Sequence, residues 1–157
     1  MSDAGAVPFV IAEREGFFAQ KGLDVEITVF KSAVDRDTAL QTGNLDGAMT
    51  DMLSIILLQE AGFPVKMTSD TYGNYILIAA PNLTVEEFEK LPKISVGLSS
   101  NTVIDFTTEK IAEAKGFGPK LSKTAIPQMP VRLEMLKAGK INGATLPEPL
   151  ASAAVLD

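Results

Sequence analysis

The sequence predicts an α/β fold made of two lobes that are built alike. Helix-like and strand-like segments alternate along the 157 residues, which is typical of sheets covered by helices. Two stretches of the first half return in the second half, in the same order and at nearly the same offset: Ala12–Phe17 as Ala112–Phe117, and Leu40–Ala48 as Leu136–Ala144. This spacing is too long for a solenoid and suits two similar lobes with a ligand between them. Chance recurrence of common helix residues and capping glycines is the competing explanation.

In the first half, each predicted helix ends at a glycine. Pro8 suits the first turn of a helix that runs toward Glu15 and Gly16. Ser32 or Asp35 caps a second helix that ends at Gly43, and Asp51 caps an apolar helix that ends at Gly62. Between the helices, short apolar segments predict strands, of which the first alternates apolar and polar residues: Val25–Phe30, Leu45–Met49 and Val65–Met67.

The second half repeats this alternation after an extended segment, Tyr75–Ala79. Thr84-Val85-Glu86-Glu87 is a capping box that begins a helix, which Pro92 ends. A longer helix ends near Lys115, Gly116 and Gly118, and another begins at Pro130 and ends at Gly139. Strands are predicted at Ile94–Gly97, Thr124–Ile126 and Ile141–Thr145. A short helix is expected after Pro149.

The two copies differ at their ends, which divides the chain into a first lobe, 1–79, and a second lobe, 80–157. Tyr75–Ala79 is expected to carry the chain between them. The second copy begins with the strand Ile94–Gly97, whereas the equivalent strand of the first copy would fall before Met1. The second copy also stops within its last helix. We therefore expect an opening strand to be missing from the first lobe and the chain to be a shortened form of a longer two-lobed protein.

Composition excludes several classes of function. A net charge of -6 and a pI near 4.7 argue against nucleic acid and against anionic membrane surfaces. No apolar run approaches the ~20 residues of a membrane helix. Without cysteine or histidine, the chain has no disulfides, no thiolate zinc site and no Ser-His-Asp or Cys-His catalysis. The acidic residues follow no calcium-loop spacing, so neither a metal nor a cofactor is expected.

Three stretches resemble the substrate-binding proteins of ABC importers, in particular the group for nitrate, sulfonates, taurine and thiamine-pyrimidine precursors. The first is Pro8–Glu26, with the pattern P-F-x-x-A-x-x-x-G-F-F-x-x-x-G-L-D-V. The others are Ala39–Ala48 and Leu136–Ala144, the latter followed by Leu146-Pro147-Glu148-Pro149. The resemblance covers nearly the whole chain.

This resemblance implies a type II periplasmic-binding-protein fold, in which two α/β lobes joined by a hinge close on a small polar molecule. It also implies delivery to an ABC permease and a periplasmic or other extracytoplasmic location, although Met1-Ser2-Asp3 shows no signal-peptide pattern. The chain departs from the family in lacking the opening strand and the C-terminal return to the first lobe. Self-association to complete the sheets is therefore an expectation as well.

The candidate ligand-binding residues lie at turns before helices, where free backbone N–H groups and the helix dipole favour anions. The family places its ligand contacts at the equivalent turns. The candidates are Pro8, Ser32, Thr50, Asp51, Ser99, Ser100, Asn101 and Thr102. Capping of the local helix is an equally ordinary role for Ser32, Thr50, Asp51 and Ser100.

Three further candidates are Phe9 and Tyr72, as aromatic walls, and Glu148, which two prolines hold rigidly. A core position for Phe9 and a surface turn for Glu148 are the alternatives. Asp51 and Glu148 occupy corresponding places in the two copies, and together they would favour a ligand with N–H or cationic groups. Arg36 and Arg132 are expected on solvated helix faces, and bidentate pairing with an anionic ligand is the alternative for each.

The predicted function is therefore non-enzymatic capture of a small polar molecule, such as a pyrimidine precursor or a sulfonate, with no catalytic residues. Two alternatives share the fold. One is the effector-binding domain of a regulator, which would follow a helix-turn-helix that this sequence does not show. The other is a small dehydratase-like enzyme, which needs only a carboxylate or polar base.

Overall fold

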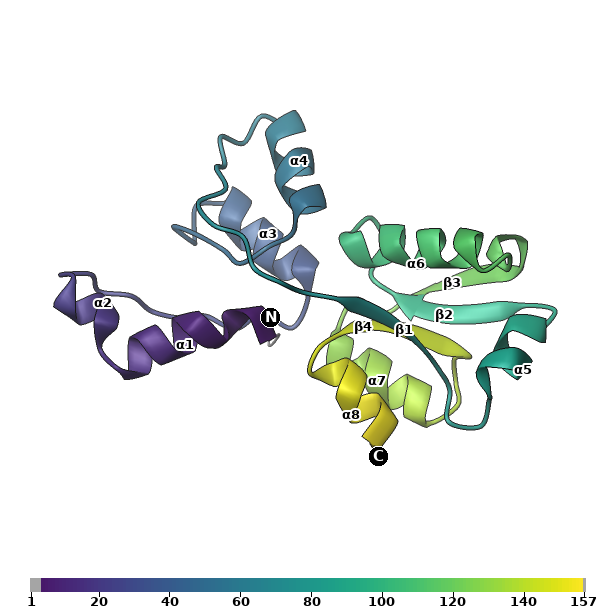
Figure 1. The fold of residues 1–157 in the computed structure, drawn as a ribbon. Coiled ribbons are helices and arrows are strands. Elements are labelled where there is room, and N and C mark those ends of the chain that lie inside the picture. Colours follow the sequence, from purple (N-terminus) through teal and green to yellow (C-terminus); the bar gives the residue numbers. More distant parts are fainter. Residues whose placement is uncertain (1–3, 157) are drawn as a thin grey trace.

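A computed structural model describes residues 4–156 (Figure 1). Short helices make up the first half, and a four-stranded sheet with helices on both faces makes up the second. In chain order the elements are η1 (Ala4–Ala6), α1 (Val7–Arg14), α2 (Phe17–Gln20), α3 (Ala33–Gln41), α4 (Met52–Glu60), β1 (Tyr75–Ala79), α5 (Val85–Lys90), β2 (Ile94–Leu98), α6 (Val103–Ala114), η2 (Gly118–Lys120), β3 (Leu121–Ala125), α7 (Met129–Lys137), β4 (Gly143–Pro147) and α8 (Leu150–Leu156). No helix within 4–156 is both long and apolar enough to cross a membrane.

The sheet has the strand order β1-β4-β2-β3. Strands β2, β3 and β4 are parallel, and β1 joins the edge antiparallel to β4, with Tyr75 opposite Pro147 and Ala79 opposite Gly143. Helix α6 covers one face, and α7 and α8 cover the other (Figure 1). Since parallel strands end at one edge, this topology brings the segments that follow β2 and β4 to the same side of the sheet.

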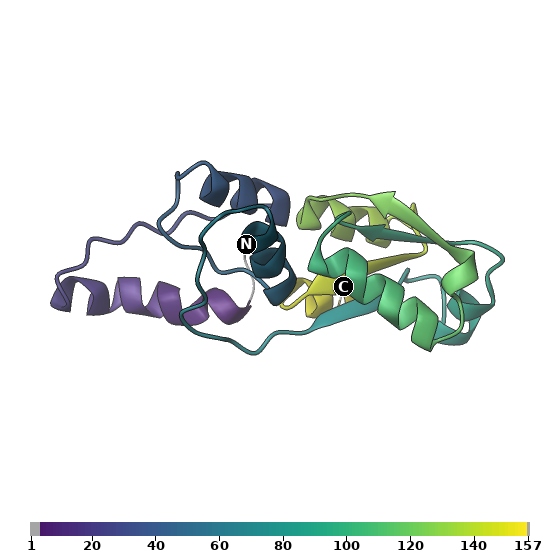
Figure 2. The ribbon, with the colours of Figure 1, turned by 90° about the horizontal axis from the view of Figure 1, so that it is seen from above.

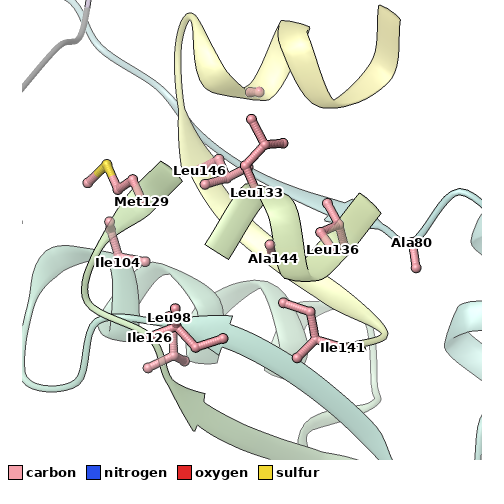
Figure 3. Close-up of a cluster of buried hydrophobic side chains, with 11 residues drawn as sticks. Ala80, Leu98, Ile104, Ile126, Met129, Leu133, Leu136, Ile141, Ala144 and Leu146 are labelled. Atoms are coloured by element: carbon pink, nitrogen blue, oxygen red, sulfur yellow. The ribbon is translucent and has the colours of Figure 1, made fainter. Parts of the chain in front are cut away.

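Nearly all of the hydrophobic core belongs to this sheet and its helices. One cluster joins strand residues such as Leu98 and Leu146 to Met129, Leu133 and Leu136 of α7 (Figure 3). A second cluster lies under α5 and α6 and contains an edge-to-face pair, Phe88 and Phe117, with ring centroids 5.6 Å apart. Residues 4–74 contribute only Ala33 and Leu58 to the buried hydrophobic residues. The sheet is therefore the rigid body on which one side of any site is built.

The predicted strands of the first half are wrong. Residues 25–30, 45–49 and 65–67 run without strand pairing, and no strand occurs in 4–74 of the described chain. The reason is that a strand is stabilised by hydrogen bonds to a neighbouring strand, and an alternating pattern cannot supply that neighbour. The division into lobes 1–79 and 80–157 stays a prediction, although Tyr75–Ala79 does lead the chain from the first-half helices into the sheet (Figure 2).

The predicted helix ends are confirmed, and the glycines that match in the sequence repeat adopt the same backbone conformation after their helices. Gly16 and Gly116 both follow a helix with positive φ, at 69° and 77°, and Gly43 and Gly139 do the same at 73° and 64°. Left-handed backbone after a helix favours glycine because it has no Cβ. The matched glycines therefore perform the same conformational task in both copies.

The capping box at α5 is confirmed. The Thr84 N–H and hydroxyl both donate to Glu87 Oε2, at 2.9 and 3.0 Å, and the Glu87 N–H donates to Thr84 Oγ1 at 3.2 Å. The two hydrogen bonds that Thr84 donates lower the pKa of Glu87 below its usual value, and the bond from the Thr84 backbone has the larger effect. Because the folded state favours the carboxylate, this cap is complete above the ordinary glutamate pKa and is lost as the pH falls through the lowered one.

Replacing Thr84 by alanine is expected to raise the pKa of Glu87 part of the way to its usual value. The substitution removes the hydroxyl donor and leaves the backbone donor in place. An NMR titration of the Glu87 side chain measures the change, with Thr84→Ser as the control that retains the hydroxyl. An identical titration curve in Thr84→Ala would show that the hydroxyl does not stabilise the carboxylate.

Candidate functional site

A cleft of about 730 Å³ lies where the first-half helices meet the end of the sheet. Its walls come from the N-terminal segment and α1, from residues 46–52 with the start of α4, and from residues 64–75. The second half contributes Val103 at the start of α6, and Pro147 and Glu148 at the end of β4. The cleft therefore draws on segments from both halves of the chain.

A second, shallower hollow of about 460 Å³ lies on the outer surface of α7. It is lined by Pro130, Val131, Glu134, Met135, Ala138 and Lys140, all from this helix and the turn that follows it. A single helix surface brings together no groups from distant parts of the chain. We therefore place the candidate site in the cleft between the halves.

Five of the sequence-predicted site residues line this cleft: Phe9, Thr50, Asp51, Tyr72 and Glu148. Phe9 is 43% exposed, so its ring belongs to the cleft wall rather than to the core. Tyr72 is fully exposed on the extended segment before β1. The hydroxyl oxygen of Thr50 is buried and has no hydrogen-bond partner among the described residues.

Asp51 has a clear structural role beside its place in the cleft. Its Oδ1 accepts the Ser54 backbone N–H at 2.9 Å, and its Oδ2 accepts the Ser54 hydroxyl at 3.1 Å. Asp51 is thus the N-cap of α4, as the sequence predicted. The positive end of α4 is therefore already paired with a carboxylate of the protein.

Glu148 closes the opposite wall, directly after β4. Its Oε2 accepts the Ser152 N–H at 3.1 Å, which ties the side chain to the first turn of α8. Its backbone carbonyl accepts the Ala4 N–H at 3.3 Å, which links the second half to the N-terminal segment. Asp51 and Glu148, which occupy corresponding places in the repeat, thus line one cleft from its two sides.

The remaining predicted site residues do not line the cleft. Ser32 caps α3 by accepting the Asp35 N–H at 3.1 Å, and Thr102 caps α6 by accepting the Ile104 N–H at 3.2 Å. Ser99 is fully buried, whereas Pro8 and Ser100 are exposed. Asn101 has a positive φ of 57°, and its N–H donates to Asp105. Helix capping accounts for Ser32 and Thr102, and turn formation accounts for Asn101.

The two arginines predicted on solvated helix faces are both buried, so that prediction is wrong. Arg132 is fully buried and donates to the carbonyls of Ile126 and Thr145 and to Ser99 Oγ. Burial lowers its pKa to about 10, so it remains charged at neutral pH. Because its acceptors follow β2, follow β3 and lie in β4, Arg132 ties together the ends of three strands, of which β4 borders the cleft.

Arg36 is 3% exposed and lies behind the wall that contains Asp51. Its Nε donates to Asp37 Oδ1 at 2.7 Å, and its Nη2 lies 3.9 Å from Asp51 Oδ2. That Nη2 makes no hydrogen bond to the described residues. The charge of Arg36 is thus offset by two neighbouring carboxylates.

Sequence reasoning missed most of the cleft wall formed by residues 64–75, together with Met49, Met52 and Val103. Residues 65–67 read as a strand, which hid their place in an extended wall. The polar residues Asp70, Thr71 and Asn74, which follow no helical or strand period, were the available signal. No group of three or more metal-ligating side chains forms in the described part of the chain.

Comparison with protein families gives a match between residues 2–157 and a model described as the NMT1-like family. No curated protein matches the chain significantly. The resemblance drawn from the sequence and the α/β, type II periplasmic-binding-protein fold class that it implied are confirmed, with one open sheet and with the strand corrections given above.

Among solved structures, the chain is similar to the periplasmic aliphatic sulphonate binding protein SsuA from Escherichia coli, with a TM-score of 0.72 and 17% identity. That match covers 97% of this chain and 51% of SsuA. It is also similar to a periplasmic binding protein from Brucella ovis with glutathione bound, with a TM-score of 0.63 and 14% identity, in a match that covers 84% of this chain and 41% of that one. A third similar structure is a mutant of ArgBP from T. maritima, with a TM-score of 0.63 and 15% identity, in a match that covers 94% of this chain and 61% of that one. The chain thus spans roughly half the length of these structures.

Proposed function

The chain belongs to the NMT1-like family, and on this premise we propose that it is a solute-binding protein that delivers a small polar molecule to an ABC importer outside the cytoplasm. The observation that carries the proposal is the cleft, which both halves of the chain line. A ligand held there contacts segments that are distant in sequence. It therefore stabilises the arrangement in which the two halves are close.

The mechanism is hinge closure about the segment that leads into β1. Residues 64–74 line the cleft without forming helix or strand, and the chain then enters the sheet at Tyr75. A few such backbone positions absorb the change in φ and ψ when two halves close. Asp51 on one side and Glu148 on the other are then the groups that a ligand bridges.

Self-association is the second part of the proposal. Large hydrophobic side chains in 4–31 are exposed, among them Val7, Ile11, Phe17, Leu23 and Val29, and α1 and α2 extend away from the sheet in both views (Figures 1 and 2). Residues 25–30 are also extended and unpaired. Exposed apolar surface and unpaired extended backbone both favour association, and a second copy of the chain offers the complementary segments.

Native mass spectrometry of the purified chain tests both parts of the proposal. We expect a dimer, and we expect mass increments when the chain is incubated with members of a panel of ethanesulfonate, glutathione, arginine and 4-aminopyrimidine. The bound compound should be released unchanged, since the proposal assigns no catalysis. A monomer that takes up no compound of any kind would contradict both parts.

Glu148→Gln is expected to weaken binding of the best panel compound about tenfold, equivalent to about 1.4 kcal/mol. Glutamine keeps an oxygen for the Ser152 N–H and removes the charge that faces the cleft. Isothermal titration calorimetry measures the affinity, with Glu60→Gln, an exposed change at the end of α4, as the control. Equal affinities in the two variants would remove Glu148 from the site.

A further inference from the structure

The cleft described above has an acidic lining, and we propose that its ligand is an organic cation with an apolar or aromatic body. Protonated amines, amidines and guanidines carried on such a body belong to this class. The inference rests on the proposed solute-binding function and names the chemistry that the site selects.

Carboxylates outnumber cations in the lining by four to one: Asp46, Asp51, Asp70 and Glu148 against Lys66. Asp46 and Asp70 are exposed to the cleft and make no ion pair or hydrogen bond within residues 4–156. If Arg36 is counted as offsetting Asp51, three carboxylates still face one lysine. A concave site lined by one sign of charge concentrates ligands of the opposite sign.

The N-terminus of α4, which lines the cleft, does not offset this charge. An anion binds at a helix start through the free N–H groups of the first turn. At α4, Asp51 accepts such a group, and at α6, whose first residue Val103 lines the cleft, Thr102 does so. Helix α1 begins beside the cleft without a side-chain cap. An incoming sulfonate or carboxylate would compete with the caps of α4 and α6, and at α4 it would meet the like charge of Asp51.

The apolar part of the wall explains why the ligand needs a body as well as a charge. Phe9, Met49, Met52, Met67 and Val103 line the same cleft. Thioether and aromatic side chains pack well against flat or irregular apolar groups, and an aromatic face attracts a cation. Phe9, which lines the same cleft as the carboxylates, is the phenylalanine available for such a contact.

The Thr50 hydroxyl is an independent sign of a ligand. Its oxygen is buried, has no partner among the described residues, and belongs to a residue that lines the cleft. A buried hydroxyl without a partner costs free energy, so native structures normally pair it. A ligand N–H group seated next to Asp51 would supply the partner.

Three probes of one shape test the inference by isothermal titration calorimetry: benzylammonium, benzenesulfonate and benzyl alcohol. We expect benzylammonium to bind at least about tenfold more tightly than benzenesulfonate at low ionic strength, and the difference to shrink as salt screens the carboxylates. Asp70→Asn and Asp46→Asn should each weaken benzylammonium binding several-fold and leave benzyl alcohol unchanged. Asp24→Asn, an exposed change outside the cleft, is the matched control.

The possible failures are distinguishable. Tighter binding of benzenesulfonate would overturn the cationic assignment while leaving the solute-binding function in place. Equal binding of all three probes would also overturn it, because charge would then play no part. If no probe binds, and no compound of the wider panel binds either, both the assignment and the proposed function fail.

Discussion

Replacing Arg132 by methionine is expected to lower the free energy of unfolding by about 3 kcal/mol or more. Methionine fills much of the same space but leaves the carbonyls of Ile126 and Thr145 and the Ser99 hydroxyl without their donor. Each buried acceptor that loses its partner costs about 1–3 kcal/mol. Urea denaturation followed by far-ultraviolet circular dichroism measures the loss.

Two controls separate the hydrogen-bond network from general effects of the substitution. Arg14→Met, on the exposed face of α1, should change stability by no more than about 0.5 kcal/mol. Arg132→Lys keeps a positive charge but lacks the planar fork that reaches several acceptors, so it should also be destabilising. If Arg132→Met were as stable as the parent, the burial cost of the charge would equal the value of its hydrogen bonds, and Arg132 would not hold the strand ends.

The second large effect is expected at Phe88, where alanine should cost about 3–5 kcal/mol because it opens a cavity under α5. The ring is 4% exposed and packs edge-to-face on Phe117. The same denaturation experiment measures the loss. Phe17→Ala is the control, since that ring is 52% exposed and should lose far less.

A double-mutant cycle with Gly143 sharpens this test. A Cβ at Gly143 would lie 2.8 Å from Phe88 Cε2 and 3.1 Å from the Ile78 carbonyl oxygen. Gly143→Ala alone should therefore cost about 1–3 kcal/mol through overpacking. In the Phe88→Ala background the cost should be smaller, because only the backbone clash remains. Strict additivity would show that the ring does not limit the space at Gly143.

The sequence predicts the second half of the fold closely and the first half only in its helices. Local signals were sufficient for the capping box at Thr84 and for the left-handed glycines, since each depends on neighbours within a few residues. Strands depend on distant partners. Ile94–Leu98 found parallel neighbours on both sides, whereas Val25–Phe30, with an equally strand-like pattern, has none.

The candidate site divides in the same way. The repeat placed Asp51 and Glu148 at equivalent positions, and both line the cleft. Residue type alone could not distinguish a polar residue that lines the cleft from one that only caps a helix. Ser32 and Thr102 were therefore predicted as site residues, although they cap helices and do not line the cleft. Nor could a pattern show that Arg132 is buried, because its acceptors come from three segments that meet only in the folded sheet.

The uneven distribution of the core has a consequence for the local stability of the two cleft walls. Segments with many buried apolar contacts are locally more stable than segments with few. Amide protons in β2 and β4 should therefore exchange with solvent only through global unfolding, while those of residues 4–31 should exchange through local openings of low free energy. The cleft thus has one rigid wall, formed by the sheet, and one flexible wall, formed by the first-half segments. If the proposed ligand binds there, part of its binding free energy goes into ordering the first-half wall, which lowers the affinity and makes the order of residues 4–31 depend on ligand occupancy.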